Sequence, residues 1–301
     1  MDFKQIEAFV AVVRNRSFSK AAEEMFLSQP TISSHINTLE KELNMQLIDR
    51  TRRQAIPTPE GQRLYSYAVT LLNTRDQALY SLQNYALNIS GVVRICASSV
   101  PGKVLVPKLM AKFRQKYEDV RFVYTQMDSQ SVMDGILRHE YEIGFVGTKK
   151  NNGLIYEPIM KDRMVLITPQ EKKYEAAVRT GMSLKDLKGE RMILRESGSG
   201  TRIAFEEALN KKGISIEELD VSAYINDTGT IIHMVESGLG VAVVSEAALE
   251  KNNPVNKYYV VELNDYHQER TIYMVNDGRI TLSPTAETFR FFAETKGGKD
   301  D

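Results

Sequence analysis

The stretch RSFSKAAEEMFLSQPTISSHINTLEKEL, residues 16–43, decides how the first part of this chain folds. Ser17 and Ser28 are each placed to cap a helix, and Pro30 fits the first turn of the second helix, where a missing N–H costs nothing. Apolar residues of the second helix recur at steps of four, three and four: Ile32, Ile36, Leu39 and Leu43. One face of that helix is therefore expected to be buried, and the pair predicts a helix-turn-helix over about residues 18–37.

The opposite face of the second helix carries short hydrogen-bonding side chains with little charge. Gln, Asn and Ser side chains can read base edges in the DNA major groove, and Ser and Thr hydroxyls can hold phosphates. The predicted DNA contacts on this face are Gln29, Pro30, Thr31, Ser33, Ser34 and Asn37. An ordinary helical hairpin with a solvated face is the alternative, because amphipathic helix pairs are common.

The sequence that follows this pair is basic and contains a short turn. Residues 47–61, LIDRTRRQAIPTPEG, bring Arg50, Arg52 and Arg53 together, where arginines can contact phosphates or enter the minor groove. We predict that Arg50 and Arg53 anchor this turn on DNA. An internal salt bridge to Asp49 or to a neighbouring helix is the alternative for Arg50.

Residues 1–61 closely resemble the N-terminal winged helix-turn-helix of LysR-type transcriptional regulators. The resemblance is carried by Phe3 and Phe9, by SFSKAAEEMFLSQPTISSHINTLEKELNMQLIDR (residues 17–50) and by TPEG (residues 58–61). It implies an α/β protein with three parts: a winged helix-turn-helix DNA-binding domain (1–59), a dimerisation linker helix (60–89) and a two-lobed, periplasmic-binding-protein-like (type 2) effector domain (90–301). It also implies a ligand-responsive regulator that binds double-stranded promoter DNA as a homodimer or homotetramer, with RNA polymerase as a further candidate partner.

Composition is that of a globular protein with more than one domain. The chain has 301 residues, of which 42% are hydrophobic and 26% charged. Its net charge of +0 argues against indiscriminate polyanion binding, so DNA affinity must come from local placement of Arg14, Arg16 and Lys20 and from a second subunit. We found no export segment or long apolar span, and therefore expect a cytoplasmic protein without a membrane partner. The only cysteine, Cys96, reads as a buried structural thiol rather than a redox sensor.

A long helix is expected from Thr58 to about Ile89, opened by Pro59 and Glu60. Steps of four and three join Leu64, Ala68, Leu71, Arg75, Ala78, Leu82, Tyr85 and Ile89, which is the pattern of a helix that pairs with another. A helix lying on its own domain is the alternative.

From residue 90 onward, strands and helices alternate, which predicts βαβ units and a parallel sheet. Expected strands include residues 92–99, 120–128 and 141–148, with helices at 103–117, 131–139, 201–212, 230–237 and 284–295. The final strand and helix can rejoin the first half. We therefore expect lobe I at about 90–163 and 268–301, and lobe II at about 164–267.

Ligands in open α/β sheets gather where strands end and the following helices begin. Hydroxyls, amides and glycines occupy these positions almost without acids, which predicts a neutral site for a small anion, held without a lysine. The predicted effector residues are Ser98, Ser99, Gly102, Thr148, Gly198, Ser199, Gly200, Thr201 and Asn226. As a bare string, the loop SGSGTR (197–202) also fits an ordinary helix cap.

In LysR-type regulators the loop that SGSGTR resembles faces a Ser/Thr pair across the interlobe cleft. The segments SSVPG (98–102) and ESGSGTR (196–202) are most similar to the branch of cysteine-biosynthesis and other sulfur or selenium regulators. This implies a tetrahedral oxyanion or a sulfur metabolite as effector. A small carboxylate would fit nearly as well.

Catalytic signatures are missing from the sequence. It has no GxSxG elbow, no GxxxxGK[ST] loop and no paired metal-ligand spacing among its four histidines. We therefore expect no enzyme activity, no cofactor and no metal. The alternative function is a small-anion binding or carrier protein without DNA contact, which would leave residues 1–60 without a role.

Overall fold

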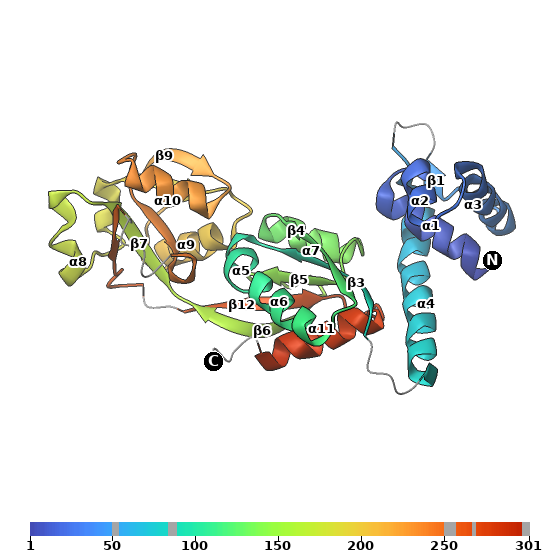
Figure 1. Cartoon of the computed structure of the whole chain (residues 1–301). Helices are drawn as coiled ribbons and strands as arrows, with labels where there is room; N and C mark the ends of the chain where they lie inside the picture. Colours follow the sequence, from blue (N-terminus) through green and yellow to red (C-terminus); the bar gives the residue numbers. More distant parts are fainter. Residues whose placement is uncertain (50–53, 84–88, 250–256, 267–268, 297–301) are drawn as a thin grey trace.

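The structure is a computed structural model that describes residues 1–49, 54–83, 89–249, 257–266 and 269–296. The chain runs from a small helical unit with two short strands, residues 1–58, called the head below, through one long helix to two α/β lobes (Figure 1). The two lobes lie side by side, and the long helix stands at the outer end of lobe I.

The head is built as its capping residues predict. Its elements are α1 (Phe3–Asn15), α2 (Phe18–Glu24), α3 (Gln29–Leu43) and the antiparallel pair β1 (Ile48–Asp49) and β2 (Ile56–Pro57). The hydroxyls of Ser17 and Ser28 accept backbone hydrogen bonds from Lys20 and Thr31, which confirms both predicted caps. Ile32, Ile36 and Leu39 of α3 are fully buried against α1.

Helix α4 (Pro59–Gln83) begins where it was predicted, and the expected end lies partly at residues 84–88, outside the described residues. The predicted pairing face is only partly correct. Ala68 is buried in the head together with Tyr65 and Val69, because α4 packs its first turns against α1. The exposed apolar side chains are Tyr67, Leu71, Leu79 and Tyr80.

Lobe I contains a five-stranded mixed sheet with strand order β4-β3-β5-β12-β6. Its elements are β3 (Gly91–Ala97), α5 (Ser99–Val104), α6 (Val106–Lys116), β4 (Val120–Gln126), α7 (Ser129–Leu137), β5 (Ile143–Val146), β6 (Ile155–Asp162), β12 (Arg270–Asn276) and α11 (Pro284–Lys296). Strands β4, β3 and β5 are parallel, whereas β12 is antiparallel to both neighbours. The predicted parallel βαβ strands are present as β4, β3 and β5, and the sheet is mixed because β12 returns from lobe II in the opposite direction.

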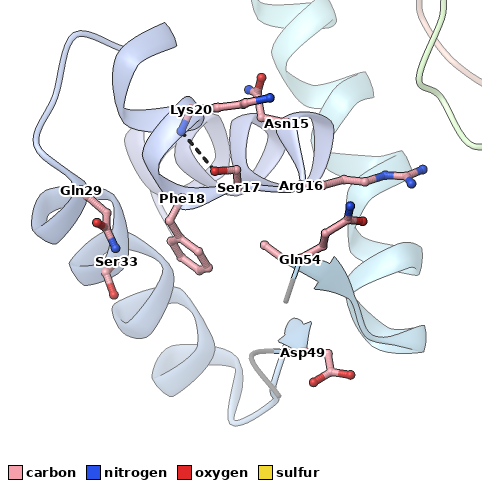
Figure 2. A pocket seen from close by; sticks show the side chains of 10 residues that line it. Asn15, Arg16, Ser17, Phe18, Lys20, Gln29, Ser33, Asp49 and Gln54 are labelled. Carbon is pink, nitrogen blue, oxygen red and sulfur yellow. Dashed lines mark hydrogen bonds between the residues drawn. The ribbon is translucent and has the colours of Figure 1, made fainter. Parts of the chain in front are cut away.

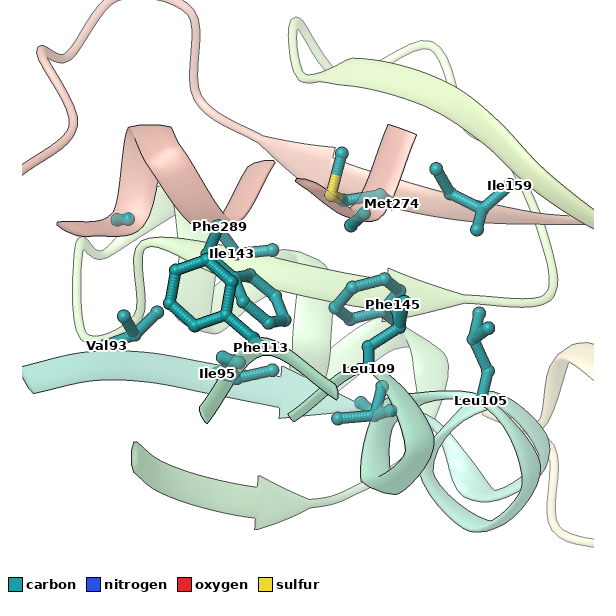
Figure 3. Packing of buried hydrophobic residues seen from close by; sticks show 14 of the residues in the cluster. Val93, Ile95, Leu105, Leu109, Phe113, Ile143, Phe145, Ile159, Met274 and Phe289 are labelled. Carbon is teal, nitrogen blue, oxygen red and sulfur yellow. The ribbon is translucent and has the colours of Figure 1, made fainter. Parts of the chain in front are cut away.

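Aromatic packing joins the chain end to lobe I. Figure 3 shows Phe113 of α6 and Phe289 of α11 in the cluster with Ile143 and Phe145 of β5. The two phenylalanine rings meet edge to face, with centroids 5.1 Å apart. The final helix thus rejoins the first half of the domain, as predicted.

Lobe II combines two small sheets. Its strands and longer helices are β7 (Met164–Pro169), α8 (Ala177–Thr180), β8 (Arg191–Arg195), α9 (Gly200–Lys211), β9 (Asp220–Ile225), α10 (Thr228–Glu236), β10 (Ala242–Ser245) and β11 (Tyr258–Val261). Short 3-10 turns occupy Lys172–Tyr174, Asp186–Gly189, Ile216–Glu218 and Glu246–Ala248. Strands β10, β7 and β11 are antiparallel, whereas β8 and β9 are parallel.

Several helix boundaries differ from the expected ones. The helix expected at 103–117 is broken at Leu105 into α5 and α6, and Pro107 in the first turn of α6 lacks the N–H that a continuous helix needs. Helix α7 starts two residues earlier than expected, since the carboxylate of Asp128 caps it. Strand β6 was not predicted. Within the described residues, none of the helices combines the length and apolar character that crossing a membrane requires.

Candidate functional site

Helix α3 presents the predicted DNA-contact residues on the side opposite its buried stripe. Gln29, Pro30, Ser34 and Asn37 are exposed, whereas Thr31 and Ser33 are half-buried. The hydroxyls of Ser28 and Thr31 lie 2.8 Å apart, which ties the start of the helix. Arg50 and Arg53, the predicted wing anchors, lie outside the described residues.

A groove of about 630 Å³ runs beside α3 on the head (Figure 2). Figure 2 shows Gln29 and Ser33 on the α3 side and Gln54 on the wing side, with the Phe18 ring between them. Arg16 and Lys20, both exposed, are the cations that line it. Amides, hydroxyls and cations beside a helix are the groups that contact the DNA backbone and base edges.

A second site lies between the two lobes. Its free volume is only about 10 Å³, about the space of one water molecule, because side chains of the lobes meet directly. The residues that line it are Ser98, Ser99, Val100, Pro101, Asp128, Ser129, Gly147, Arg195, Ser199, Gly200, Thr201 and Arg270. Five predicted effector residues are therefore brought together here from sequence positions a hundred residues apart: Ser98, Ser99, Ser199, Gly200 and Thr201.

Glycine at position 200 lets the lobes approach. A Cβ atom there would lie 3.1 Å from the Ser129 hydroxyl and 3.3 Å from the carbonyl carbon of Gly147, both on lobe I. Such contacts are tighter than most side chains tolerate. A side chain at this position would require Ser129 or Gly147 to shift by a few tenths of an ångström.

The other predicted effector residues lie around this cleft rather than lining it. A Cβ at Gly102 would lie 2.2 Å from the Tyr124 hydroxyl, and one at Gly198 would lie 2.7 Å from a carboxylate oxygen of Asp128. Asn226 contributes its backbone carbonyl to the Arg195 side chain, at 2.9 Å. Thr148 is half-buried, and its neighbour Gly147 lines the cleft instead.

The expectation of a neutral site was wrong, because two buried arginines line the cleft. Arg195 ends β8, is 4% exposed, and donates to the Ser99 hydroxyl of lobe I at 2.8 Å. It also donates to Thr228 Oγ1 at 2.9 Å and to Glu196 Oε1 at 2.9 Å. This guanidinium therefore joins lobe II directly to lobe I.

Arg270, at the start of β12, is the second arginine. Its Nε donates to Asp162 Oδ2 at 2.7 Å, and its Nη1 donates to Thr201 Oγ1 at 3.0 Å. Its Nη2 is buried without a hydrogen-bond partner among the described residues, and so is the hydroxyl of Ser129. Two unsatisfied donors in one cleft indicate a place for an acceptor, because buried polar groups are nearly always paired.

Sequence reasoning missed these arginines because it took the residues that follow each strand and left out the terminal residues of the strands themselves. The signal was present in RMILRES and RTIYMVN, where an arginine borders an otherwise apolar strand. Charged residues are rarely buried unless they are paired. An arginine at the end of a buried strand is therefore a candidate ligand group.

Asp128 is the acid nearest the unsatisfied Ser129. Burial raises the pKa of its carboxyl, but hydrogen bonds from Ser131 and Gln130 outweigh this and hold the pKa below its ordinary value. The carboxylate is therefore ionised and committed to capping α7. Both arginines have carboxylate partners of their own, Glu196 and Asp162, and Arg270 Nη2 is the guanidinium nitrogen that remains without a hydrogen-bond partner among the described residues.

Comparisons with known proteins cover both parts of the chain. A family model described as "LysR substrate binding domain" matches residues 88–297, and one described as "Bacterial regulatory helix-turn-helix protein, lysR family" matches residues 3–62. An uncharacterised HTH-type transcriptional regulator of Methanocaldococcus jannaschii is 35% identical over 273 residues, 91% of this chain and 92% of the relative. The HTH-type transcriptional regulator CysL of Bacillus subtilis is 27% identical over 290 residues, 96% of this chain and 95% of CysL.

Solved structures share the fold over the same span. A full-length OxyR variant from Pseudomonas aeruginosa has a TM-score of 0.78 at 18% identity, covering 98% of this chain and 97% of that chain. The regulatory domain of CcmR from Synechocystis, in complex with 2-PG, has a TM-score of 0.62 at 20% identity, covering 68% of this chain and 97% of that chain. With both family models matched in order and the helix-turn-helix and two-lobed domain in place, the chain belongs to the LysR family of ligand-responsive transcriptional regulators.

Proposed function

We propose that this regulator senses a small anion that binds between the two lobes. The observation that carries the proposal is the pair of buried guanidinium groups, Arg195 and Arg270, with an unsatisfied Arg270 Nη2 and an unsatisfied Ser129 hydroxyl in the same cleft. An anion accepts from such donors and gains a charge-assisted hydrogen bond. A neutral ligand would gain less from the same positions.

Entry of the effector requires the lobes to separate, since the described cleft has room for about one water molecule. The contacts that would open are the Arg195–Ser99 and Arg270–Thr201 hydrogen bonds. An anion bound between the same donors would replace these contacts on both lobes. The effector would then shift the population between two interlobe arrangements, by as much as it binds one better than the other.

Carboxylates and tetrahedral oxyanions both suit this donor set. Arginine binds either through paired N–H groups, and the hydroxyls of Ser98, Ser199 and Thr201 supply further donors. The similarity to CysL keeps sulfur-linked oxyanions among the candidates. The CcmR regulatory domain, which shares the fold, was solved with 2-PG, so other small ligands belong in the same trial.

We infer that the outer face of α3 reads DNA, through Gln29, Pro30, Thr31, Ser33, Ser34 and Asn37, and that Arg16 and Lys20 contact phosphates. We infer that Arg50 and Arg53 extend this contact from the wing. The exposed apolar side chains of α4, including Leu71 and Leu79, support pairing with a second copy. The proposed protein is a homodimer or homotetramer that acts on promoter DNA in the cytoplasm. It has RNA polymerase as a partner and carries out no catalytic step.

The effector is tested by thermal unfolding of the full chain against sulfate, thiosulfate, sulfite, selenate, O-acetylserine and small carboxylates. A ligand at a hundred times its dissociation constant should add about 2.7 kcal/mol, or roughly 5–10 °C in Tm. Thr201→Ala should reduce the shift. Thr288→Ala is the matched control, because its hydroxyl bonds the Pro284 carbonyl on α11, outside the cleft. A shift that survives in Thr201→Ala would place the anion elsewhere.

The DNA contact is tested by selecting bound duplexes from a random library with the full chain and measuring the affinity of variants. Ser33→Ala and Ser34→Ala should each weaken binding about fivefold, the loss of roughly 1 kcal/mol per hydrogen bond. Ser66→Ala on α4 is the control, since its hydroxyl bonds the Arg63 carbonyl within the helix. Equal affinity of all three variants would disprove this assignment of the α3 face.

A further inference from the structure

The head and the first half of α4 contact lobe I of the same chain through residues that follow α7. The Tyr65 hydroxyl on α4 donates to the His139 carbonyl at 3.4 Å, and the two rings stack with centroids 6.5 Å apart. Arg16 Nη2, at the start of the helix-turn-helix, lies 3.0 Å from Glu140 Oε1. Both residues of lobe I directly follow α7, and His139 adopts a left-handed backbone that turns the chain toward the head.

Further contacts extend this interface along lobe I. Arg94 of β3 lies 3.7 Å from Glu24 of α2. Asn73 and Gln77 of α4 donate to the carbonyls of Thr281 and Leu282, at 2.7 and 2.8 Å. Most of these contacts are polar, and Ile280 adds an apolar contact with the buried cluster of the head. A groove of about 430 Å³ lies beside Arg16, Tyr65 and Glu140. An interface of this kind is suited to reversible docking, in contrast to a continuous hydrophobic core.

Helix α7 connects this interface with the interlobe cleft. Its first turn, at Asp128 and Ser129, lines the cleft, and its last turn leads into His139 and Glu140. Nine residues at about 1.5 Å each separate the two ends by about 14 Å. Val132, Met133 and Ile136 are fully buried against the sheet, so the helix is held as a rigid element.

We propose that lobe I docks the head through Glu140 and the start of α4 through His139, and that α7 transmits the state of the cleft to this contact. Arg16 lines both the groove beside α3 and the groove facing lobe I. Glu140 and a DNA phosphate are therefore alternative partners of one guanidinium. The cleft end of this connection depends on the proposed effector site, whereas the docking contact does not.

Docking is tested by backbone hydrogen exchange of the full chain, read across the interface. Glu140→Arg should speed exchange in the head-side segment 62–77 by about two- to fivefold, and Arg16→Glu should do the same in segment 138–142. The double variant reverses the sign of the ion pair. Because Arg138, 3.1 Å from Glu140 in the parent, stays in place, both segments should move toward the parental rates without reaching them. Glu118→Arg makes the same charge change at an exposed position of lobe I and should leave both segments unchanged.

Two results would overturn the docking contact: single variants that exchange like Glu118→Arg, or a double variant no slower than the singles. Transmission along α7 is tested separately, by measuring hydrogen exchange after adding a DNA duplex obtained from the random-library selection. DNA should speed exchange at residues 128–131 in the parent and have no further effect in Glu140→Arg. If DNA changed exchange at 138–142 but not at 128–131, α7 would not transmit the docking state to the cleft. Neither readout depends on finding the effector.

Discussion

Replacing Arg270 with methionine tests the energetics of the interlobe cleft. Arg270 and Asp162 form an ion pair at 2.7 Å, with side chains 7% and 0% exposed. Arg270→Met would leave the Asp162 carboxylate buried without its cation, which typically costs about 3–5 kcal/mol. Asp162 keeps hydrogen bonds from the Ser245 hydroxyl at 2.7 Å and the Ala247 N–H at 3.4 Å. These remaining donors place the expected loss of unfolding free energy near the lower end, about 3 kcal/mol.

The measurement is urea unfolding of the full chain, followed by circular dichroism, for Arg270→Met, Asp162→Leu and the double variant. The double variant removes both charges and should recover most of the loss, since apolar replacement of a whole buried pair is often neutral. The same unfolding experiment, repeated with the anion identified by thermal unfolding, should show stabilisation of the parent and none of Arg270→Met. If Arg270→Met lost less than about 1 kcal/mol of unfolding free energy, this reasoning would be refuted, because burying a carboxylate without its cation should cost more than that.

Other predictions concern separate parts of the chain. Ile36→Ala, at a fully buried position of α3, should cost about 2–5 kcal/mol and abolish DNA binding while anion-dependent melting of the lobes persists. The pKa of Asp128 is lowered on folding, so the stability that its carboxylate contributes is present above pH 3.8 and is lost as the pH falls through the folded value. The difference in unfolding free energy between the parent and Asp128→Asn, measured by urea titration, should therefore shrink in acid. Leu71→Arg should dissociate the proposed homo-oligomer in sedimentation. Cys96 should react with a thiol reagent only after unfolding, because burial raises the pKa of its thiol.

Much of the head could be predicted because its signals are local. Ser17 and Ser28 cap helices within three residues of themselves, and the steps from Ile32 to Leu43 identify the buried face of α3 without knowledge of its partner. The loop with Ser199 and Thr201 was found by the same kind of reasoning, since strand ends and helix starts are visible in the order of elements.

Features that depend on distant partners were missed. The pairing face of α4 was only partly predicted, because which apolar side chains are buried depends on how α1 lies against it. The direction of β12 was missed because a strand returning from another lobe carries no local sign of being antiparallel. The charge of the cleft was missed because Arg195 and Arg270 belong to strands that meet only after both lobes have formed.

Local sequence patterns were enough to predict the helix-turn-helix, the alternation of strands and helices, and the Ser and Gly loops, because capping and periodicity act over a few residues. Folding of the whole chain brings Arg195 to Ser99, Arg270 to Thr201 and Arg16 to Glu140. These pairs are separated by 96, 69 and 124 positions. Contacts of that range depend on how whole lobes pack, and no short stretch of sequence contains that information.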